Sequence, residues 1–109
     1  MSKNLLRSSL LIQRAYDRFL VTLCNKTRLT IIQLLIKKPK NVNQLTHELG
    51  IHQTSVSHAL KRLLDCGFVF VKRNGKERIY SLNKKTIEPL IKLMENHISR
   101  NCSKGVCSN

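Results

Sequence analysis

A chain of 109 residues with 41% hydrophobic residues is expected to fold as one domain with a modest core. Its 20 lysines and arginines against six acids leave a formal net charge of +14, which predicts a polyanionic partner unless the charge only aids solubility. No apolar run approaches the roughly 20 residues of a membrane-spanning helix and no signal peptide is recognised, so we expect no membrane role and a cytoplasmic protein with reduced cysteines.

The first third of the chain predicts two helices. Residues 5–24 carry a broad apolar band, so this helix either lies inside the core or packs against a partner subunit. Asn25 can cap a second helix over residues 27–37, which is apolar nearly all round and should be the central core helix. Pro39 cannot continue its hydrogen-bond ladder.

Two further helices are predicted in a helix-turn-helix arrangement. Asn43 can cap a short helix over residues 44–49, and Gly50 supplies the left-handed residue that ends it. Residues 51–64 then combine an apolar stripe with a face of short polar and basic side chains. Serine and threonine lower helix propensity. Their clustering at the start of this segment therefore indicates either N-capping or an edge that reads base pairs in a DNA major groove.

A β-hairpin and a last helix complete the predicted order. β-rich runs at residues 68–71 and 79–82 flank Asn74-Gly75, a dipeptide typical of a two-residue hairpin because both residues tolerate positive φ. The tip carries four cations and one acid, which favours contact with phosphates or a minor groove over a merely solvated tip. Residues 83–100 predict an amphipathic helix with Pro89 near its start, followed by a polar tail.

Three segments of this order match one family pattern. Leu23 to Leu29 resembles an L-x-D-P-T-R-L motif, with Asn25 and Lys26 in place of Asp and Pro. Residues 44–63 resemble the helix-turn-helix of the same family, and residues 66–82 resemble its wing. The chain thus resembles the ArsR/SmtB family of bacterial and archaeal transcriptional repressors over residues 20–83. Other winged-helix families, MarR-like regulators among them, share the helix-turn-helix pattern.

The resemblance implies a mainly α fold with a small β-hairpin wing (α+β), a winged helix-turn-helix with flanking dimerisation helices. The winged domain would cover residues 1–101, with dimerisation helices at 5–24 and 84–100 and a Cys-containing tail at 102–109. It further implies a homodimeric repressor that binds a palindromic operator in double-stranded DNA. The dimer interface would include Leu6, Leu10, Phe19, Leu90, Ile91 and Met94.

The same resemblance assigns DNA contacts to the helix at 51–64 and to the wing. Glutamine can pair bidentately with adenine and serine with several base edges, whereas basic side chains contact phosphates. His58 has the alternative of being a simple solvated residue. The residues that would approach base edges are Gln53, Thr54, Ser55, Ser57 and His58. Those that would contact phosphates are Lys61, Arg62, Lys72, Arg73, Lys76 and Arg78.

The chain departs from both familiar metal sites of the family. A Cys-x-Cys-like pair is missing before and within residues 44–49. In the last helix, Glu88, Glu95 and His97 do not reproduce the spacing of the family's zinc site. The sequence therefore supports neither site.

The four cysteines divide into two pairs. Cys24 and Cys66 adjoin apolar positions and are expected to be small buried hydrophobes. Cys102 and Cys107 lie in the polar tail beside cations, which favour the thiolate. With His97 they could bind a soft metal or arsenite, or they could oxidise to a disulfide; the alternative is a flexible tail without a ligand.

The residue types make an enzyme unlikely on chemical grounds, because the sequence offers neither a nucleophile–base set, nor paired acids, nor a Gly-rich phosphate loop. No cofactor is expected apart from the possible thiol chemistry of the tail. A sequence-specific DNA-binding regulator is the leading hypothesis. The alternatives are a sequence-tolerant architectural DNA-binding protein and a winged-helix module that binds other proteins.

Overall fold

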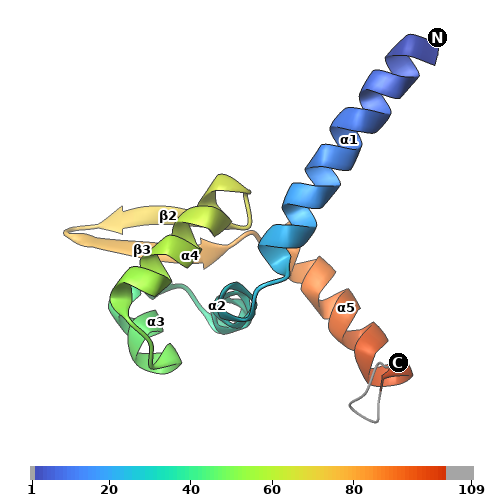
Figure 1. Ribbon diagram of the computed structural model, residues 1–109. Helices are drawn as coiled ribbons and strands as arrows, with labels where there is room; N and C mark the ends of the chain where they lie inside the picture. Colours follow the sequence, from blue (N-terminus) through green and yellow to red (C-terminus); the bar gives the residue numbers. More distant parts are fainter. Residues whose placement is uncertain (1, 103–109) are drawn as a thin grey trace.

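The computed structural model describes the backbone of residues 2–102 and the side chains of residues 9–102. Within them, five helices combine with a small sheet, and α1 projects from the body as a long rod (Figure 1). The predicted mainly α fold with a β wing is confirmed. The elements are α1 (Ser2–Leu23), α2 (Lys26–Lys37), β1 (Lys40–Asn41), α3 (Val42–Leu49), α4 (Gln53–Asp65), β2 (Val69–Asn74), β3 (Glu77–Leu82) and α5 (Ile87–Asn101).

Helix α2 lies at the centre of the core, as its sequence predicts. Its Ile31, Ile32 and Leu35 are buried, and three further apolar side chains of α2 pack against the same cluster. Full burial of one such side chain stabilises the fold by about 1.5–3 kcal/mol. Around α2 the core is completed by Leu45, Val56, Ala59, Leu60, Leu63, Phe68, Val69, Tyr80, Leu82, Ile87 and Ile91.

The sharp bend between α1 and α2 is held by caps on both sides. The Asn25 side chain accepts a hydrogen bond from the backbone N–H of Arg28 at 2.9 Å, which caps α2. The Arg28 guanidinium turns back to α1 and donates to the carbonyls of Thr22 at 2.6 Å and Val21 at 3.0 Å. Arg28 therefore satisfies carbonyls that the end of α1 leaves without an intrahelical partner. The arginine of the T-R-L motif is thus a structural residue.

Helix α3 begins two residues earlier than the sequence predicts. Its N-cap is Asn41, not Asn43, and the Asn41 and Gln44 side chains form a reciprocal capping box. Residues 40–41 also pair with β3, so the sheet has three strands in the order β1-β3-β2, where the sequence predicts only a hairpin. Buried Lys40 in this unpredicted strand pairs with Glu48 at 3.1 Å.

The hairpin turn is shifted by one residue from the predicted pair. Asn74 faces Glu77 across the ladder, so the loop consists of Gly75 and Lys76. Gly75 takes φ +68°, and the described non-glycine residues all have negative φ. Positive φ at the first loop residue alone fits a type II′ turn, which matches the twist of the two strands. The prediction that Asn74 shares the positive φ is wrong.

The starts of α4 and α5 also differ from the sequence prediction. His52 is the N-cap of α4 and makes no side-chain cap bond, so the hydroxyls of Thr54 and Ser55 do not cap this helix. Helix α5 begins at Ile87, four residues later than predicted, because the Asn83 side chain accepts from the backbone N–H groups of Lys85 and Thr86. This Asx turn leads the chain into the helix.

A helix that crosses a membrane must be both long and strongly apolar. No single helix in the described part of the chain meets both requirements. Residues 9–23 of α1 and helix α2 meet them jointly, but the two are bent by 79° at the break.

Candidate nucleic-acid interface

Helix α4 separates its two faces sharply. Val56, Ala59, Leu60 and Leu63 are buried and fix the helix to the core. The opposite face is open, and it carries all five residues that the sequence places at base edges. Because its hydroxyls take no part in a cap, they keep their hydrogen-bonding capacity for a ligand. The exposed residues of this face are Gln53, Thr54, Ser55, Ser57 and His58.

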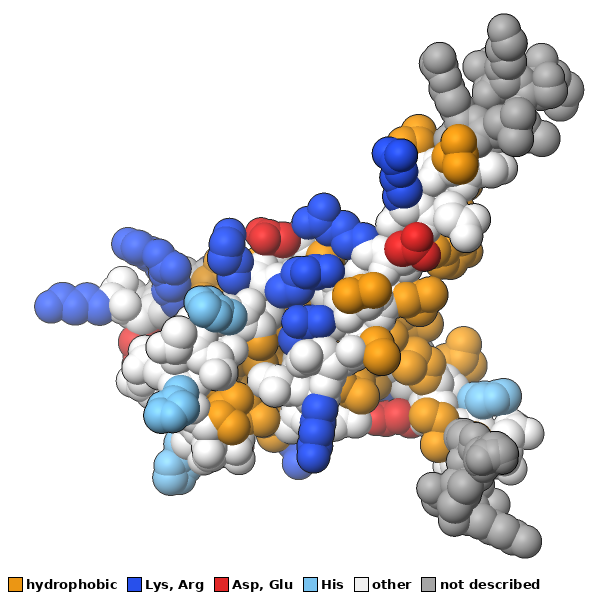
Figure 2. Space-filling model, viewed as in Figure 1, with side chains coloured by type: hydrophobic (Ala, Val, Ile, Leu, Met, Phe, Trp, Pro, Cys, Tyr) orange, Lys and Arg blue, Asp and Glu red, His pale blue; other side chains and the backbone are white. Residues whose placement is uncertain are grey.

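The wing adds an exposed basic ribbon beside α4. Arg73 and Arg78 are direct partners in the β2–β3 register, so two cations share one face of the hairpin. Like charges in this arrangement destabilise a hairpin, which indicates that the pair serves another purpose. A polyanion would relieve the repulsion. Lys72 and Lys76 are exposed as well, and Figure 2 shows Lys and Arg side chains gathered at this end of the molecule.

A cavity of about 250 Å³ joins the start of α4 to the wing. It is lined by Gln53 from α4, by Lys76, Glu77 and Arg78 from the hairpin, and by the start of α3. The one acid in this group, Glu77, has a hydrogen-bond partner, because the Asn41 side-chain amide donates to its carboxylate at 3.1 Å. The structure therefore brings a predicted base-reading residue and two predicted phosphate ligands to one site.

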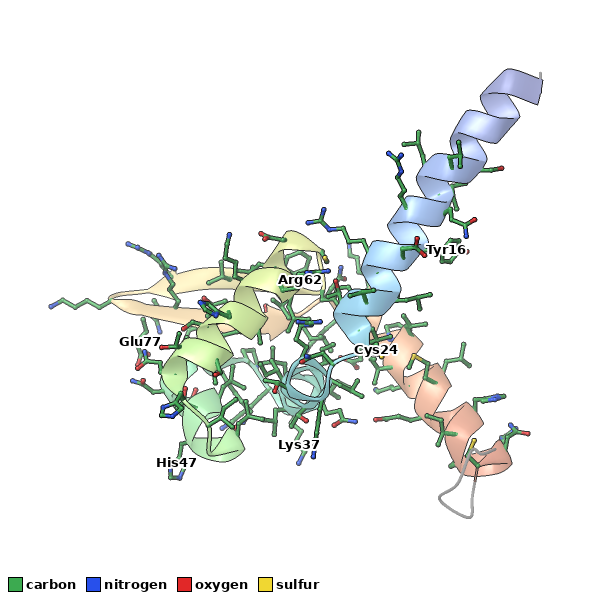
Figure 3. The ribbon with its side chains drawn as sticks, viewed as in Figure 1. Tyr16, Cys24, Lys37, His47, Arg62 and Glu77 are labelled. Atoms are coloured by element: carbon green, nitrogen blue, oxygen red, sulfur yellow. The ribbon has the colours of Figure 1, made fainter. Side chains whose placement is uncertain are left out.

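Two neighbouring basic residues of α4 have different environments. Lys61 is exposed and makes a long contact of 3.7 Å with Asp65, which leaves it available to a phosphate. Arg62 is half-buried, and its Nε donates to Thr22 Oγ1 on α1 at 2.9 Å, between the two helices (Figure 3). One of the five N–H donors of Arg62 thus joins α4 to α1. Contact of its remaining donors with a phosphate stays a prediction.

Thr22 is the centre of a polar cluster that the sequence does not reveal. Its buried hydroxyl donates to the Arg18 carbonyl at 2.7 Å, accepts from Arg62, and lies 3.2 Å from Cys66 Sγ. Burial raises the pKa of the Cys66 thiol. Hydrogen bonding to Thr22, Arg18 and Arg62, together with the charge of Arg18, outweighs this effect and lowers the pKa below its usual value.

Neither internal cysteine is the buried hydrophobe that the sequence predicts. Cys24 is exposed at the end of α1, and Cys66 is half-buried. Cys66 packs against the core cluster, but its sulfur contacts polar groups on α1 and α4. The only signal in the sequence is Thr22, a polar residue within the apolar band of the first helix.

A second surface, formed by α1 and α5, is apolar. Its exposed hydrophobic side chains form the orange area over these two helices in Figure 2. Phe19 and Leu90 line a cavity of about 490 Å³ between the helices, together with Ile12, Ala15 and Tyr16. The exposed large hydrophobic residues of the two helices are Leu10, Leu11, Ile12, Tyr16, Leu20, Val21, Leu93 and Ile98.

The six residues predicted for a dimer interface have different positions in this structure. Leu10 is exposed, and Phe19, Leu90 and Met94 are half-buried beside the apolar surface. Ile91 is only 1% exposed and belongs to the core, so its assignment to an interface is wrong. Ile91 faces the core, whereas its neighbour Leu90 is half-buried beside the apolar surface. The spacing of apolar residues in the sequence does not show which of the two faces inward. The side chain of Leu6 lies outside the described residues.

The predicted thiol pair lies at the limit of what the structure describes. Cys102 is half-buried and ends α5, where its N–H donates to the Ile98 carbonyl at 2.6 Å. Cys107 lies outside the described residues. Within residues 9–102, the His, Cys, Asp and Glu side chains form no group of three or more that could hold a metal ion.

Comparison with known proteins relates the helix-turn-helix to one family. The family model of the bacterial regulatory proteins of the arsR family matches residues 25–70, which include the helix-turn-helix and the start of the wing. Over this segment the chain is similar to the ArsR family. Its sequence is 33% identical over 76 residues to a probable mercury resistance operon repressor of Streptomyces lividans. That match covers 70% of this chain and spans 61% of the length of the Streptomyces protein.

Solved structures of helix-turn-helix proteins share the fold. The crystal structure of Mycobacterium tuberculosis Rv0081 superposes with a TM-score of 0.79 at 26% identity, covering 89% of this chain and 97% of that protein. A solution structure of Mb0332 from Mycobacterium bovis, a homodimeric winged helix-turn-helix DNA-binding domain, has a TM-score of 0.78 at 22% identity and covers 94% of each chain. Both likenesses extend over α1 and α5 as well as the winged core, because they cover most of this chain.

Proposed function

We propose that this protein is a cytoplasmic, sequence-specific DNA-binding repressor of the ArsR family that acts as a homodimer on a palindromic operator. The observation that carries the proposal is the exposed polar face of α4 beside a basic wing. Gln53 and the wing residues Lys76 and Arg78 line one cavity, so base-reading and phosphate-binding groups can contact the same duplex. A helix with this geometry can enter a major groove while the wing follows the adjacent backbone.

The residues divide by the kind of contact they can make. Gln53 can form a bidentate pair with adenine, and Ser55, Ser57 and His58 offer further groups to base edges. Lys61 and the cations of the wing neutralise phosphates without reading sequence. Arg62 can contact a phosphate through its terminal N–H groups, because Thr22 accepts only its Nε hydrogen.

The apolar surface of α1 and α5 supports the dimer. A patch of eight exposed large hydrophobic residues on two helices is more than a monomeric soluble protein usually leaves open to water. A second copy of the chain would cover it, and a two-fold dimer presents two α4 helices to two half-sites. The described homodimer of the Mycobacterium bovis domain is consistent with this arrangement.

A repressor of this kind can also be regulated by a ligand or by oxidation. The similarity to a probable mercury resistance operon repressor suggests a soft metal. The candidate ligands that the sequence offers for it are Cys102 and Cys107 together with His97, and the role of the two cysteines in metal or redox sensing stays a prediction.

Selection of bound duplexes from a random pool tests the proposal. We expect an enriched palindrome, bound about 10³-fold or more tightly than a scrambled duplex at the same salt concentration. Equal affinity for both duplexes would identify the alternative of an architectural DNA-binding protein. Absence of binding to any duplex at low salt would favour a module that binds other proteins.

A further inference from the structure

Three arginines surround an open cavity at the junction of α1 and α4. Arg14 and Arg18 of α1 and Arg62 of α4 line a space of about 470 Å³ with Asp17 and Val21. None of these arginines forms an ion pair with a described carboxylate. Three arginines against the one carboxylate of Asp17 leave the cavity with an excess of positive charge, so an anion entering it would be attracted.

A thiol lies beside this charge. An adjoining cavity of about 390 Å³ is lined by Ala15, Arg18, Phe19, Asp65 and Cys66. Arg18 lines both cavities, so an anion held by the arginines is next to the Cys66 sulfur. The acid of this second cavity, Asp65, faces Lys61 at 3.7 Å, which offsets part of its charge.

The hydrogen bonds around Thr22 can accommodate both states of the thiol. A hydroxyl has one proton to donate and two lone pairs. With a protonated Cys66, the Thr22 hydroxyl can donate to the Arg18 carbonyl and accept from the S–H and from Arg62. With a thiolate, it can turn its proton to the sulfur and still accept from Arg62. Together with the lowered pKa of Cys66, this favours a reactive thiolate.

We propose that Cys66 and the arginines at the α1–α4 junction form a modification site for small anionic disulfides. The Cys66 thiolate attacks one sulfur of the disulfide, and a new S–S bond forms as the old one breaks. The displaced half leaves as a thiolate with the bonding electron pair, so no further oxidant is needed. The arginines bind carboxylates of the reagent and hold it at the sulfur.

An adduct on Cys66 would also alter α4. The sulfur is 3.2 Å from Thr22, so an attached group must displace the contact that joins the end of α4 to α1. If the proposed DNA-binding function is correct, modification weakens operator binding by about fivefold or more, the range of ordinary coupling between two sites. This consequence rests on the proposed function, whereas the modification itself does not.

Competition between two cysteines of the same chain tests the proposal. The full-length reduced protein is treated with glutathione disulfide, which is anionic, or with cystamine, which is a cationic disulfide. Peptide mass spectrometry then follows the adducts on Cys66 and on exposed Cys24. We expect glutathione disulfide to modify Cys66 at least about tenfold faster than Cys24, and cystamine to lose this preference. Equal rates at both cysteines, or a preference of Cys66 for cystamine, would overturn the proposal.

Charge variants separate binding of the reagent from a merely accessible thiol. Arg18→Gln should remove the preference of Cys66 for the anionic reagent, and Arg18→Lys should restore part of it. Circular dichroism of both variants shows whether α1 is still folded. A preference that survives Arg18→Gln in the folded protein would refute the role of the arginines. If modification proceeds as proposed but no duplex is bound, the DNA-binding proposal fails and the thiol site stands.

Discussion

A single buried hydroxyl joins α4 to α1. Thr22 is fully buried and contacts both Arg62 and Cys66, so its loss leaves the Nε of Arg62 without an acceptor. We expect Thr22→Val to lower the free energy of unfolding by about 1–3 kcal/mol, measured by denaturant titration. Thr30→Val is the matched control, because the Thr30 hydroxyl also donates to a carbonyl four residues earlier but joins no second helix. Equal losses in the two variants would contradict a tertiary role for Thr22.

The lowered pKa of Cys66 has a consequence for stability that depends on pH. In the folded protein Cys66 loses its proton at a lower pH than in the unfolded chain, so the unfolded state binds more protons between the two pKa values. Stability should therefore rise with pH in that interval, and this contribution should be lost as pH falls through the folded pKa. We expect the free-energy difference between the wild type and Cys66→Ser to grow from pH 6 to pH 9. A constant difference in denaturant titrations would exclude the shift.

Base reading also belongs to single residues. Gln53→Ala should relax the base preference at one or two operator positions, by about 1–3 kcal/mol of discrimination. Binding to other positions should be unchanged, because α4 keeps its buried anchors. Duplex selection with the variant measures the preference profile. Asn43→Ala, which removes another side chain of the same cavity, is the control; identical profiles for the wild type and Gln53→Ala would exclude Gln53 as a reader.

For single residues, the sequence predicts which face of a helix a side chain lies on better than it predicts which groups the side chain contacts. The polar face of α4 follows from periodicity, since a helix that buries Val56 and Leu63 turns the side chains of Thr54, His58 and Lys61 outward. The inward turn of Arg62 does not, because it depends on Thr22, which is 40 residues distant in the chain. The same holds for Cys66, whose polar surroundings come from a helix that the local sequence cannot place.

Among the elements, the wing carries a pair of arginines that should lower the stability of the hairpin but strengthen binding to DNA. Arg73 and Arg78 repel each other across the ladder. Arg73→Ala should therefore leave the free energy of unfolding unchanged or slightly higher, while it weakens binding to all duplexes alike. Each lost phosphate contact should reduce the salt slope of log affinity by about 0.9. Salt titrations on specific and scrambled duplexes measure both effects, and an unchanged slope would remove Arg73 from the interface.

The elements that the sequence predicts are those with a strong repeating pattern. Helices α2 and α4 and the hairpin have apolar periodicity and clear stop signals, so their existence follows from local sequence. Strand β1 has two residues, too few for any pattern, and it exists because β3 offers it a partner. The start of α3 is also difficult to predict, because Asn41 and Asn43 are both good N-cap residues. The Gln44 side chain, which completes the capping box with Asn41, decides between them.

At the scale of the whole molecule, the open question in the sequence is which surface covers the broad apolar band of the first helix. Part of this band is covered by the chain's own core. The ring of Phe19 packs against that of Phe68 with centroids 4.9 Å apart, and Leu23 packs against the core cluster. The outer part of α1 stays exposed because no element within residues 2–102 covers it. Periodicity shows that the band is apolar, but not which surface covers it.

The proposed dimer predicts that this outer part of α1 controls both size and DNA affinity. Tyr16 is 62% exposed and lines the cavity between α1 and α5, so a charge there should oppose association of two copies. We expect Tyr16→Glu to halve the mass measured by light scattering toward the 12.6 kDa of one chain. Operator affinity should fall about a hundredfold or more, because one protomer loses the effective concentration supplied by the other.

Phe70→Glu is the control for the dimer prediction. Phe70 is 54% exposed and apolar, but it lies on β2 and is not part of the apolar surface of α1 and α5. The Phe70→Glu variant should therefore stay dimeric at the protein concentrations at which the Tyr16→Glu variant is a monomer. If both variants keep the mass of the wild type, α1 and α5 do not form the interface. If both become monomers, added charge alone explains the dissociation and the assignment of the surface fails.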